Sequence, residues 1–399
     1  MADYHDPERL ANEIRQCLAQ HKRPLGLLLG AGCPSSVKVS DEPLIPDIAG
    51  LTKAVCQKIC ASDTKDLFKA FCTNFGVKGE PQDTVEEILT YIRSLQQVAG
   101  TGDLRGLTAS HLATLDSAVC DAINDLASKT LPVGTTPYHK AALWMGAAQR
   151  ESSVEVFTPN YDLLMEQALE VKRVPYFDGF VGAFEPFFDA RAIEEIALPP
   201  RWVGLWKLHG SVNWYQKEIG PKIGFVFRAE NPGHSPRRVI HPSHLKYDES
   251  RRMPYVAMMD RLRAFLKKPY SVLVTCGYSF KDQHINAILL EGVQANRTSA
   301  VFGLLHGTLD RYPHAEALAD NGVTLNLLAR DGAVVAGKKA VWMTKAGTAA
   351  GKPSPDVKWT VLKDGTMQAE FLLGDFVCFG DFLDELVGAT SREGESDAQ

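Results

Sequence analysis

Four short segments of the chain combine glycine with polar side chains where an apolar, strand-like run ends. Such a junction can bind a phosphate, because glycine lacks a Cβ atom and lets backbone N–H groups approach closely, and a following helix N-terminus favours negative charge. In an open parallel sheet the carboxyl ends of the strands converge on one crevice, so the four segments can meet there. They are Gly30-Ala31-Gly32, Thr158-Pro159-Asn160-Tyr161-Asp162, His209-Gly210-Ser211 and Gly277-Tyr278-Ser279.

Each segment also has a purely structural interpretation. The glycine turn departs from the G-x-G-x-x-G pattern of dinucleotide sites, because Ser35 stands where the third glycine is expected. Asn160 could cap the helix that follows it, and Ser279 with Asp282 fits a capping box. A lone histidine such as His209 is more often a hydrogen-bonding residue than a catalyst. The coincidence of all four segments favours a functional site.

Strand and helix patterns alternate on both sides of a long helical block, which predicts an α/β fold with a doubly wound, mostly parallel sheet. We expect one domain over residues 1–330, with a helical insertion at about 50–150. A small α+β extension over 331–388 and a disordered tail over 389–399 should follow. The predicted strands are 26–29, 153–158, 203–208, 271–276, 300–305 and 323–328, and helices are expected at 7–22, 163–171, 254–267, 283–295, 311–320 and 375–387.

The composition is that of a globular protein, with 399 residues, 45% hydrophobic and 23% charged. A net charge of −5 with no long basic run argues against direct binding to nucleic acid or to an anionic membrane. The N-terminus lacks a leader pattern, and no apolar stretch is long enough to span a bilayer. Eight scattered cysteines without a Cys-x-x-Cys pair indicate neither a zinc ribbon nor a disulfide framework. We therefore expect a cytoplasmic protein.

Three other features have a weaker claim to function. Cys33 beside the glycine turn is expected to be a small buried residue rather than a reactive thiol. The loop over 228–247, rich in Pro, His and Arg, has the length of a lid or an interaction loop, and its irregular histidine spacing does not favour a metal site. The apolar side of the last helix is expected to pack in the core, although such a helix could also dock a partner subunit.

The four segments together resemble the sirtuin family. Sirtuins have Thr-Gln-Asn-Ile-Asp where this chain has residues 158–162, and they share the glycine turn, Leu208-His209-Gly210, Gly277-Tyr278-Ser279 and an Ile-Pro-Asp, here ending at Asp47. The similarity extends over about residues 24–310. It implies a Rossmann-like NAD site and cleavage of the bond between nicotinamide and ribose.

The resemblance also implies residue roles. Asn160 would orient a water, His209 would bind the ribose and act as general base, and Asp162 would hold the nicotinamide carboxamide. The residues implied in NAD binding are Gly30, Ala31, Gly32, Asp47, Thr158, Gly277 and Ser279.

The sequence departs from the sirtuin deacylases in three respects, one of which is that the strand that binds the acyl-lysine peptide after His-Gly is not recognisable. The two cysteine pairs of their zinc module are missing, so we expect no zinc, and Ile48-Ala49 follows Asp47 where deacylases continue with Phe and Arg. The chain is more similar to sirtuin-like proteins of bacterial antiphage defence, which consume NAD, and to the kind that pairs with a HerA-like DNA-translocating ATPase. This resemblance implies an NAD glycohydrolase that forms a homo-oligomer and is regulated by assembly with such an ATPase. The alternatives are a scaffold that senses NAD or ADP-ribose, and a zinc-free deacylase or ADP-ribosyltransferase.

Overall fold

The fold is built on a ten-stranded sheet. The computed structural model describes residues 4–79, 82–147, 150–217, 225–230, 237–240, 254–320, 324–346 and 355–396. In spatial order the strands are β1 (Tyr4–His5), β19 (Lys338–Trp342), β18 (Gly332–Val335), β17 (Leu325–Leu328), β16 (Ala300–Leu304), β15 (Val272–Cys276), β2 (Leu25–Leu29), β7 (Val154–Thr158), β11 (Val203–Lys207) and β8 (Tyr176–Phe177).

From β17 to β8 every neighbouring pair of strands is parallel. The strands on the two sides of β2 come from different parts of the chain: β7 lies on one side of it and β15, much later in the sequence, on the other. This reversal is the topological switch point at which open α/β sheets bind ligands. The predicted doubly wound α/β fold is confirmed.

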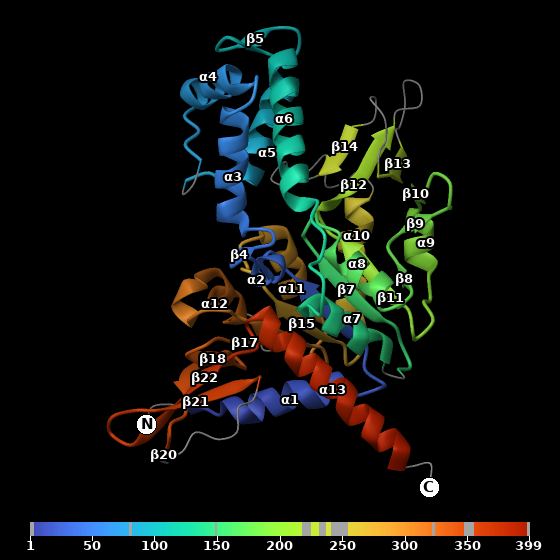
Figure 1. Ribbon diagram of the computed structural model, residues 1–399, viewed down its shortest axis with the longest axis vertical. Helices are drawn as coiled ribbons and strands as arrows, with labels where there is room; N and C mark the ends of the chain where they lie inside the picture. Colours follow the sequence, from blue (N-terminus) through green and yellow to red (C-terminus); the bar gives the residue numbers. More distant parts are fainter. Residues whose placement is uncertain are drawn as a thin grey trace.

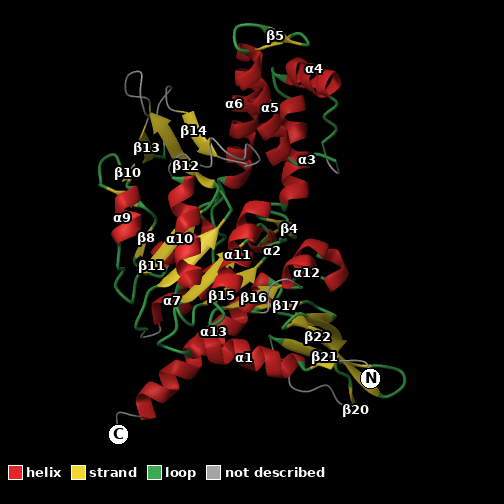
Figure 2. Ribbon diagram, turned by 180° about the vertical axis from the view of Figure 1, so that it is seen from behind, coloured by secondary structure: helices red, strands yellow, loops and turns green. Residues whose placement is uncertain are grey.

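Helices cover both faces of the sheet (Figures 1 and 2). Alternate strand residues point to opposite faces: Leu27 and Leu29 pack against one group of helices, whereas Leu28 packs against the other. The first group is α1 (Pro7–Ala19), α7 (Pro137–Ala147), α8 (Leu164–Val171) and α13 (Phe376–Ser396). The second is α9 (Ala190–Glu195), α10 (Tyr255–Lys267), α11 (Gln283–Ala295) and α12 (Pro313–Ala319).

The helical insertion is shorter than the sequence predicts. Helices α3 to α6 stand together at the top of Figure 1 and enclose a hydrophobic core of their own. In contrast, α7 lies against α8 and α13 in the core of the sheet, so the insertion ends near residue 127. The elements of this part are α2 (Gly32–Ser36), β3 (Lys38–Val39), β4 (Glu42–Pro43), α3 (Ile48–Cys60), α4 (Lys65–Phe75), α5 (Val85–Ala99), β5 (Asp103–Leu104), β6 (Leu107–Thr108) and α6 (Ala109–Ala127).

Part of the predicted C-terminal extension joins the main sheet. Strands β18 and β19 continue the ten-stranded sheet in antiparallel pairing. The predicted aromatic stripe of α13 is buried: Phe376, Phe379 and Phe382 are each at most 1% exposed. The helix continues to Ser396 instead of ending near Val387, and residues 397–399 lie outside the described residues.

Two smaller sheets complete the fold. One contains β14 (Arg237–Ile240), β12 (Gly210–Lys217), β13 (Phe225–Arg228), β10 (Phe187–Phe188) and β9 (Phe180–Val181), and the other β20 (Lys345–Ala346), β22 (Thr366–Phe371) and β21 (Val357–Val361). The predicted hairpin after residue 214 is therefore present as β12 and β13. Of the predicted loop over 228–247, residues 237–240 form strand β14, and 231–236 and 241–247 lie outside the described residues.

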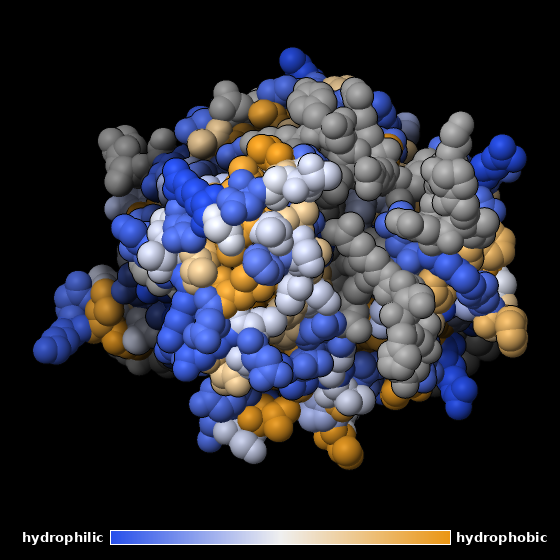
Figure 3. All heavy atoms as spheres, turned by 90° about the horizontal axis from the view of Figure 1, so that it is seen from above, coloured by the Kyte–Doolittle hydropathy of each residue, from blue (hydrophilic) through white to orange (hydrophobic). Residues whose placement is uncertain are grey.

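The surface over the helical insertion is largely hydrophilic, with hydrophobic residues in smaller groups (Figure 3). Among the described helices, none combines the length and the hydropathy that crossing a membrane requires.

Candidate functional site

The four segments singled out in the sequence follow four adjacent parallel strands. Strands β15, β2, β7 and β11 are neighbours in that order, and Cys276 pairs with Leu29 just as Lys207 pairs with Thr158. The four segments therefore leave the sheet at one edge. Asn160 and His209 each lie two residues beyond the paired residues Thr158 and Lys207, so they start from adjacent positions.

The turns that follow β2 and β15 touch each other at the switch point of the sheet, and their glycines allow this contact. The N–H of Gly30 donates to the Cys276 carbonyl (3.0 Å) and that of Gly32 to the Gly277 carbonyl (2.9 Å). A Cβ atom on Gly30 would lie 2.4 Å from the Gly277 oxygen, and one on Gly277 would lie 2.6 Å from the Cys33 nitrogen. These glycines are needed for the two turns to touch, which is a structural reason for them that stands whether or not a phosphate binds.

Asn160 is held against the glycine turn rather than used as a helix cap. Its Nδ2 donates to the Gly30 carbonyl (3.0 Å), and its backbone N–H donates to Thr158 Oγ1 (3.0 Å). Thr158 in turn donates its hydroxyl to the Leu29 carbonyl (2.7 Å). The capping alternative for Asn160 is therefore wrong, and Asp162 instead accepts the hydrogen bond from Leu164 N–H (3.0 Å) at the start of α8.

His209 is buried and paired with an acid from another junction. Its Nε2 lies 2.9 Å from Asp282 Oδ2, and the residue is 4% exposed. Burial lowers the pKa of His209, but the contact with Asp282 and the charge of Glu86 outweigh it, so the pKa stands above its ordinary value. The pKa of Asp282 is correspondingly held well below its usual value, against the effect of burial, by His209 and two backbone N–H groups.

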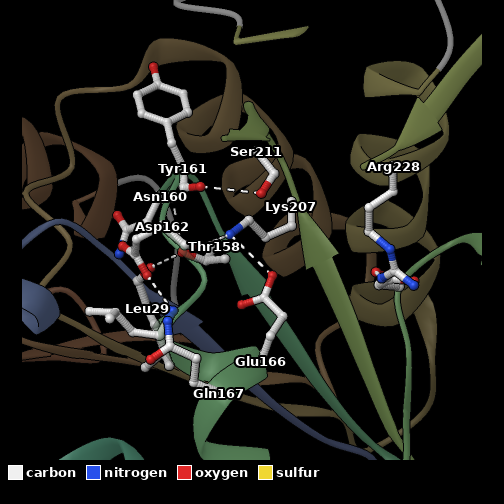
Figure 4. A network of polar contacts seen from close by, with 12 residues as sticks. Leu29, Thr158, Asn160, Tyr161, Asp162, Glu166, Gln167, Lys207, Ser211 and Arg228 are labelled. Atoms are coloured by element: carbon white, nitrogen blue, oxygen red, sulfur yellow. Dashed lines mark hydrogen bonds and ion pairs between the residues drawn. The ribbon is translucent and has the colours of Figure 1, made fainter. Parts of the chain in front are cut away.

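Asp162 belongs to a buried polar network that the sequence analysis did not identify (Figure 4). Lys207, 2% exposed, donates its ammonium to the Asp162 carbonyl and lies 3.3 Å from Glu166 Oε1. Burial raises the pKa of both Asp162 and Glu166, and the nearby Lys207 limits that rise. The signal for Lys207 was available: a lysine that ends a buried strand, directly before Leu208-His209, needs a buried anionic partner.

The helical insertion reaches the site through Tyr161. In Figure 4 the Tyr161 ring points away from Lys207, while its carbonyl accepts hydrogen bonds from Ser211 Oγ (3.2 Å) and Val212 N–H (3.0 Å). The phenol donates to Glu86 Oε1 at the start of α5 (2.9 Å). Tyr161 is buried in the core of the insertion, although it lies between Asn160 and Asp162 in the chain.

Three predicted binding residues have exposed positions: Ala31, Asp47 and Ser279. Asp47 caps α3, since its Oδ1 accepts from Gly50 N–H (2.9 Å). Asp282, and not Ser279, is the cap of α11, so the alternative interpretation of this pair as a capping box is wrong. Cys33 is fully buried as expected, and burial raises its pKa well above the ordinary value.

Two cavities lie near this edge of the sheet. A small one, of about 10 Å³, has room for about one water molecule and is lined in part by Thr158, Asn160, Asp162, Glu166 and Lys207. A much larger cleft, of about 1440 Å³, lies between α6, α8 and the β12–β13 hairpin, and none of the predicted site residues lines it. Within the described ranges, no group of three or more His, Cys, Asp or Glu side chains is arranged to hold a metal ion.

A family model matches residues 154–325. It describes a SIR2-like domain. The matched range contains Asn160, Asp162, His209 and Gly277 but not the glycine turn at Gly30. No curated protein matches the chain.

Solved Sir2 structures are also similar to this chain. A Sir2 homologue in complex with NAD is 14% identical over 79% of this chain and 89% of its own, with a TM-score of 0.35. A Sir2 enzyme studied for mechanism and regulation is 12% identical over 75% and 85%, with a TM-score of 0.35. A mutant Sir2 homologue in complex with ADP-ribose is 12% identical over 73% and 83%, with a TM-score of 0.30.

Proposed function

We propose that the protein is an NAD glycohydrolase, which cleaves NAD to nicotinamide and ADP-ribose. The observation that supports the proposal is that Asn160 contacts the glycine turn and that the strand before His209 lies beside the strand before Asn160, at the switch point of the sheet. The match of residues 154–325 to a SIR2-like domain supports it.

The reaction breaks an N-glycosidic bond. The oxygen of a water attacks the anomeric carbon of the ribose, and the electron pair of the C–N bond moves to the positively charged pyridinium nitrogen, so nicotinamide leaves neutral and needs no acid. The proton of the water passes to His209 and then to solvent. In this proposal Asn160 orients the water and Asp162 binds the carboxamide, while the residues of the two glycine turns bind the phosphates and the adenosine.

Purified full-length chain incubated with NAD tests the proposal, with nicotinamide and ADP-ribose measured separately. Asn160→Ala and His209→Ala should each lower the rate by about 100-fold or more, because general-base and positioning effects are of that size. Asn74→Ala is the matched control: Asn74 also donates its side-chain amide to a carbonyl, that of Arg105 (2.8 Å), but in the helical insertion. It should cleave at the parent rate.

The same assay separates the alternatives. If His209→Ala cleaved NAD as fast as the parent, the assignment of the base would be wrong. A scaffold that senses NAD or ADP-ribose would bind the nucleotide without releasing nicotinamide. A zinc-free deacylase would release nicotinamide only with an acetylated peptide present, and an ADP-ribosyltransferase would retain label from NAD on protein.

The biological setting is proposed on the sequence resemblance alone. We propose a toxic effector of antiphage defence in the bacterial cytoplasm, controlled in a homo-oligomer or by a HerA-like ATPase. Co-expression with such an ATPase, followed by light scattering and the NAD assay, tests the pairing. Two proteins that elute separately and show unchanged NAD cleavage would count against it.

A further inference from the structure

We propose that Asp282 is a positioning residue that fixes the His209 ring through Nε2 and leaves Nδ1 as the nitrogen that accepts the proton. The inference rests on the proposed function, in which His209 is the general base. The contact itself is direct: Nε2 lies 2.9 Å from Asp282 Oδ2, and the Asp282 side chain is 19% exposed.

The carboxylate of Asp282 is itself held in place. Its Oδ1 accepts hydrogen bonds from His284 N–H (2.8 Å) and Ile285 N–H (3.0 Å), which makes Asp282 the cap of α11. One oxygen is therefore bound to a helix that is packed on the sheet through buried residues such as Ile288, and the other is left for the imidazole. A carboxylate fixed in this way defines both the orientation and the tautomer of the histidine beside it.

The second ring nitrogen of His209 has a different environment. Within the described residues both ring nitrogens are buried and neither makes an aligned hydrogen bond, but only Nε2 has a carboxylate oxygen at ion-pair distance, and Nδ1 has none. His209 follows β11 and Asp282 follows shortly after β15, so the pair spans the ends of β2 and β7, which lie between these strands. These are the ends that carry Gly30 and Asn160, where the proposed reaction takes place.

The charges around the ring favour a base that becomes an imidazolium. Asp282 from the α11 junction and Glu86 from α5 are the charged groups that act on His209, and both are acidic. When neutral His209 takes the proton of the water at Nδ1, the ionised Asp282 stabilises the cation without accepting a proton itself. This is the same interaction that raises the pKa of His209 despite its burial.

Two substitutions separate this role from helix capping. Asn and Ser are both good cap residues, so Asp282→Asn and Asp282→Ser keep the cap of α11, but Asn removes the charge and Ser also removes the reach to His209. Asp6→Ser is the matched control, because Asp6 caps the 13-residue helix α1 in the same way, through Glu8 and Arg9 N–H groups. The two Asp282 variants should lose on the order of 100-fold or more in NAD cleavage, with the acid limb of the pH profile shifted to lower pH. The control should change neither.

A second readout does not depend on NAD cleavage. Nitrogen NMR of the labelled full-length chain, with the His209 signals assigned by their loss in His209→Gln, reports which ring nitrogen carries the proton. The parent should show protonated Nε2 at alkaline pH, and Asp282→Ser should lose this preference and titrate at lower pH. If the parent did not cleave NAD but showed this pattern, the pairing would stand and the glycohydrolase proposal would fail.

Three results would overturn the inference. They are an unchanged tautomer in Asp282→Ser, an unchanged rate and pH profile, and a rate above that of the parent. The last would show that Asp282 restrains His209 rather than preparing it.

Discussion

At the scale of single residues, Lys207 connects two buried acidic residues next to the proposed site. Its ammonium lies between the carbonyl of Asp162 and the carboxylate of Glu166, and all three residues are buried. Removing one partner of a buried ion pair leaves a charge without compensation, which costs more than the pair contributes.

We therefore expect Lys207→Met to lower the free energy of unfolding by about 3–5 kcal/mol, measured by urea denaturation. Lys217→Met is the control, because Lys217 pairs with Glu185 at the surface and should contribute less than about 1 kcal/mol. Adding Glu166→Gln to Lys207→Met should recover part of the loss. Equal effects of the two lysine substitutions would contradict the account of the network.

The pair of His209 and Asp282 should make stability depend on pH in a direction that can be derived. The pKa of folded His209 is raised, so the folded state binds the proton more tightly than the unfolded state, and the resulting stabilisation is complete below about pH 6.5 and lost as pH rises through the raised value. In Asp282→Asn burial dominates and lowers the pKa of His209, so acidification should destabilise this variant. The difference in unfolding free energy between parent and variant should grow from about pH 8 to about pH 5.5. A difference that is constant over this range would contradict the pairing. Other groups with shifted pKa values, such as Asp162, are present in both proteins, so their contributions cancel in the difference.

At the scale of elements, the contact between the turns after β2 and β15 allows a direct test. Gly277 has φ +65°, and a Cβ atom there would lie 2.6 Å from the Cys33 nitrogen. Gly76, with φ +72°, has the same backbone strain but no atom within 4 Å of such a Cβ. Gly277→Ala should thus be more destabilising than Gly76→Ala by about 1–3 kcal/mol in thermal or urea unfolding, because only the first adds a clash to the strain. Equal losses would mean that the turns are not in close contact.

The sequence predicts the elements of the sheet better than their surroundings. Strands β2, β7, β11, β15, β16 and β17 were predicted within two residues, since buried runs bounded by glycine and polar residues have few other interpretations. The sequence does not predict where the insertion ends. Helix α7 needs an apolar surface in either position, and only the structure shows that this surface packs on α8 and α13 instead of on the insertion helices. Likewise, β18 and β19 are short β-like segments whose partner in the sheet is determined by distant residues.

The same limit applies to the site. Side chains that follow strand ends, such as Asn160 and His209, could be placed at one edge from the sheet order alone. The pairing of His209 with Asp282 and the identity of the acid beside Lys207 could not, because which side chains meet across loops depends on the tertiary packing of the turns.

At the scale of the whole molecule, the helical insertion and the sheet have separate cores. Buried residues of α3 to α6 form one cluster, which Tyr161 and Val212 join from the sheet side. Separate cores connected by few side chains open in separate steps. In hydrogen exchange, amides of α5 and α6 should therefore exchange through an opening of lower free energy than those of β2 and β15. Exchange of both sets with one rate and one denaturant dependence would show that the molecule opens as a single unit.

Tyr161 connects the helical insertion to the proposed site. Its ring is anchored among distant helices, while its backbone is continuous with Asn160 on one side and Asp162 on the other. A partner protein that bound these helices and moved α5 would also move Tyr161, and with it the backbone that carries Asn160 and Asp162. In the proposed NAD glycohydrolase, a displacement of Tyr161 would then alter the positions of Asn160 and Asp162 without any contact between the partner and the nucleotide.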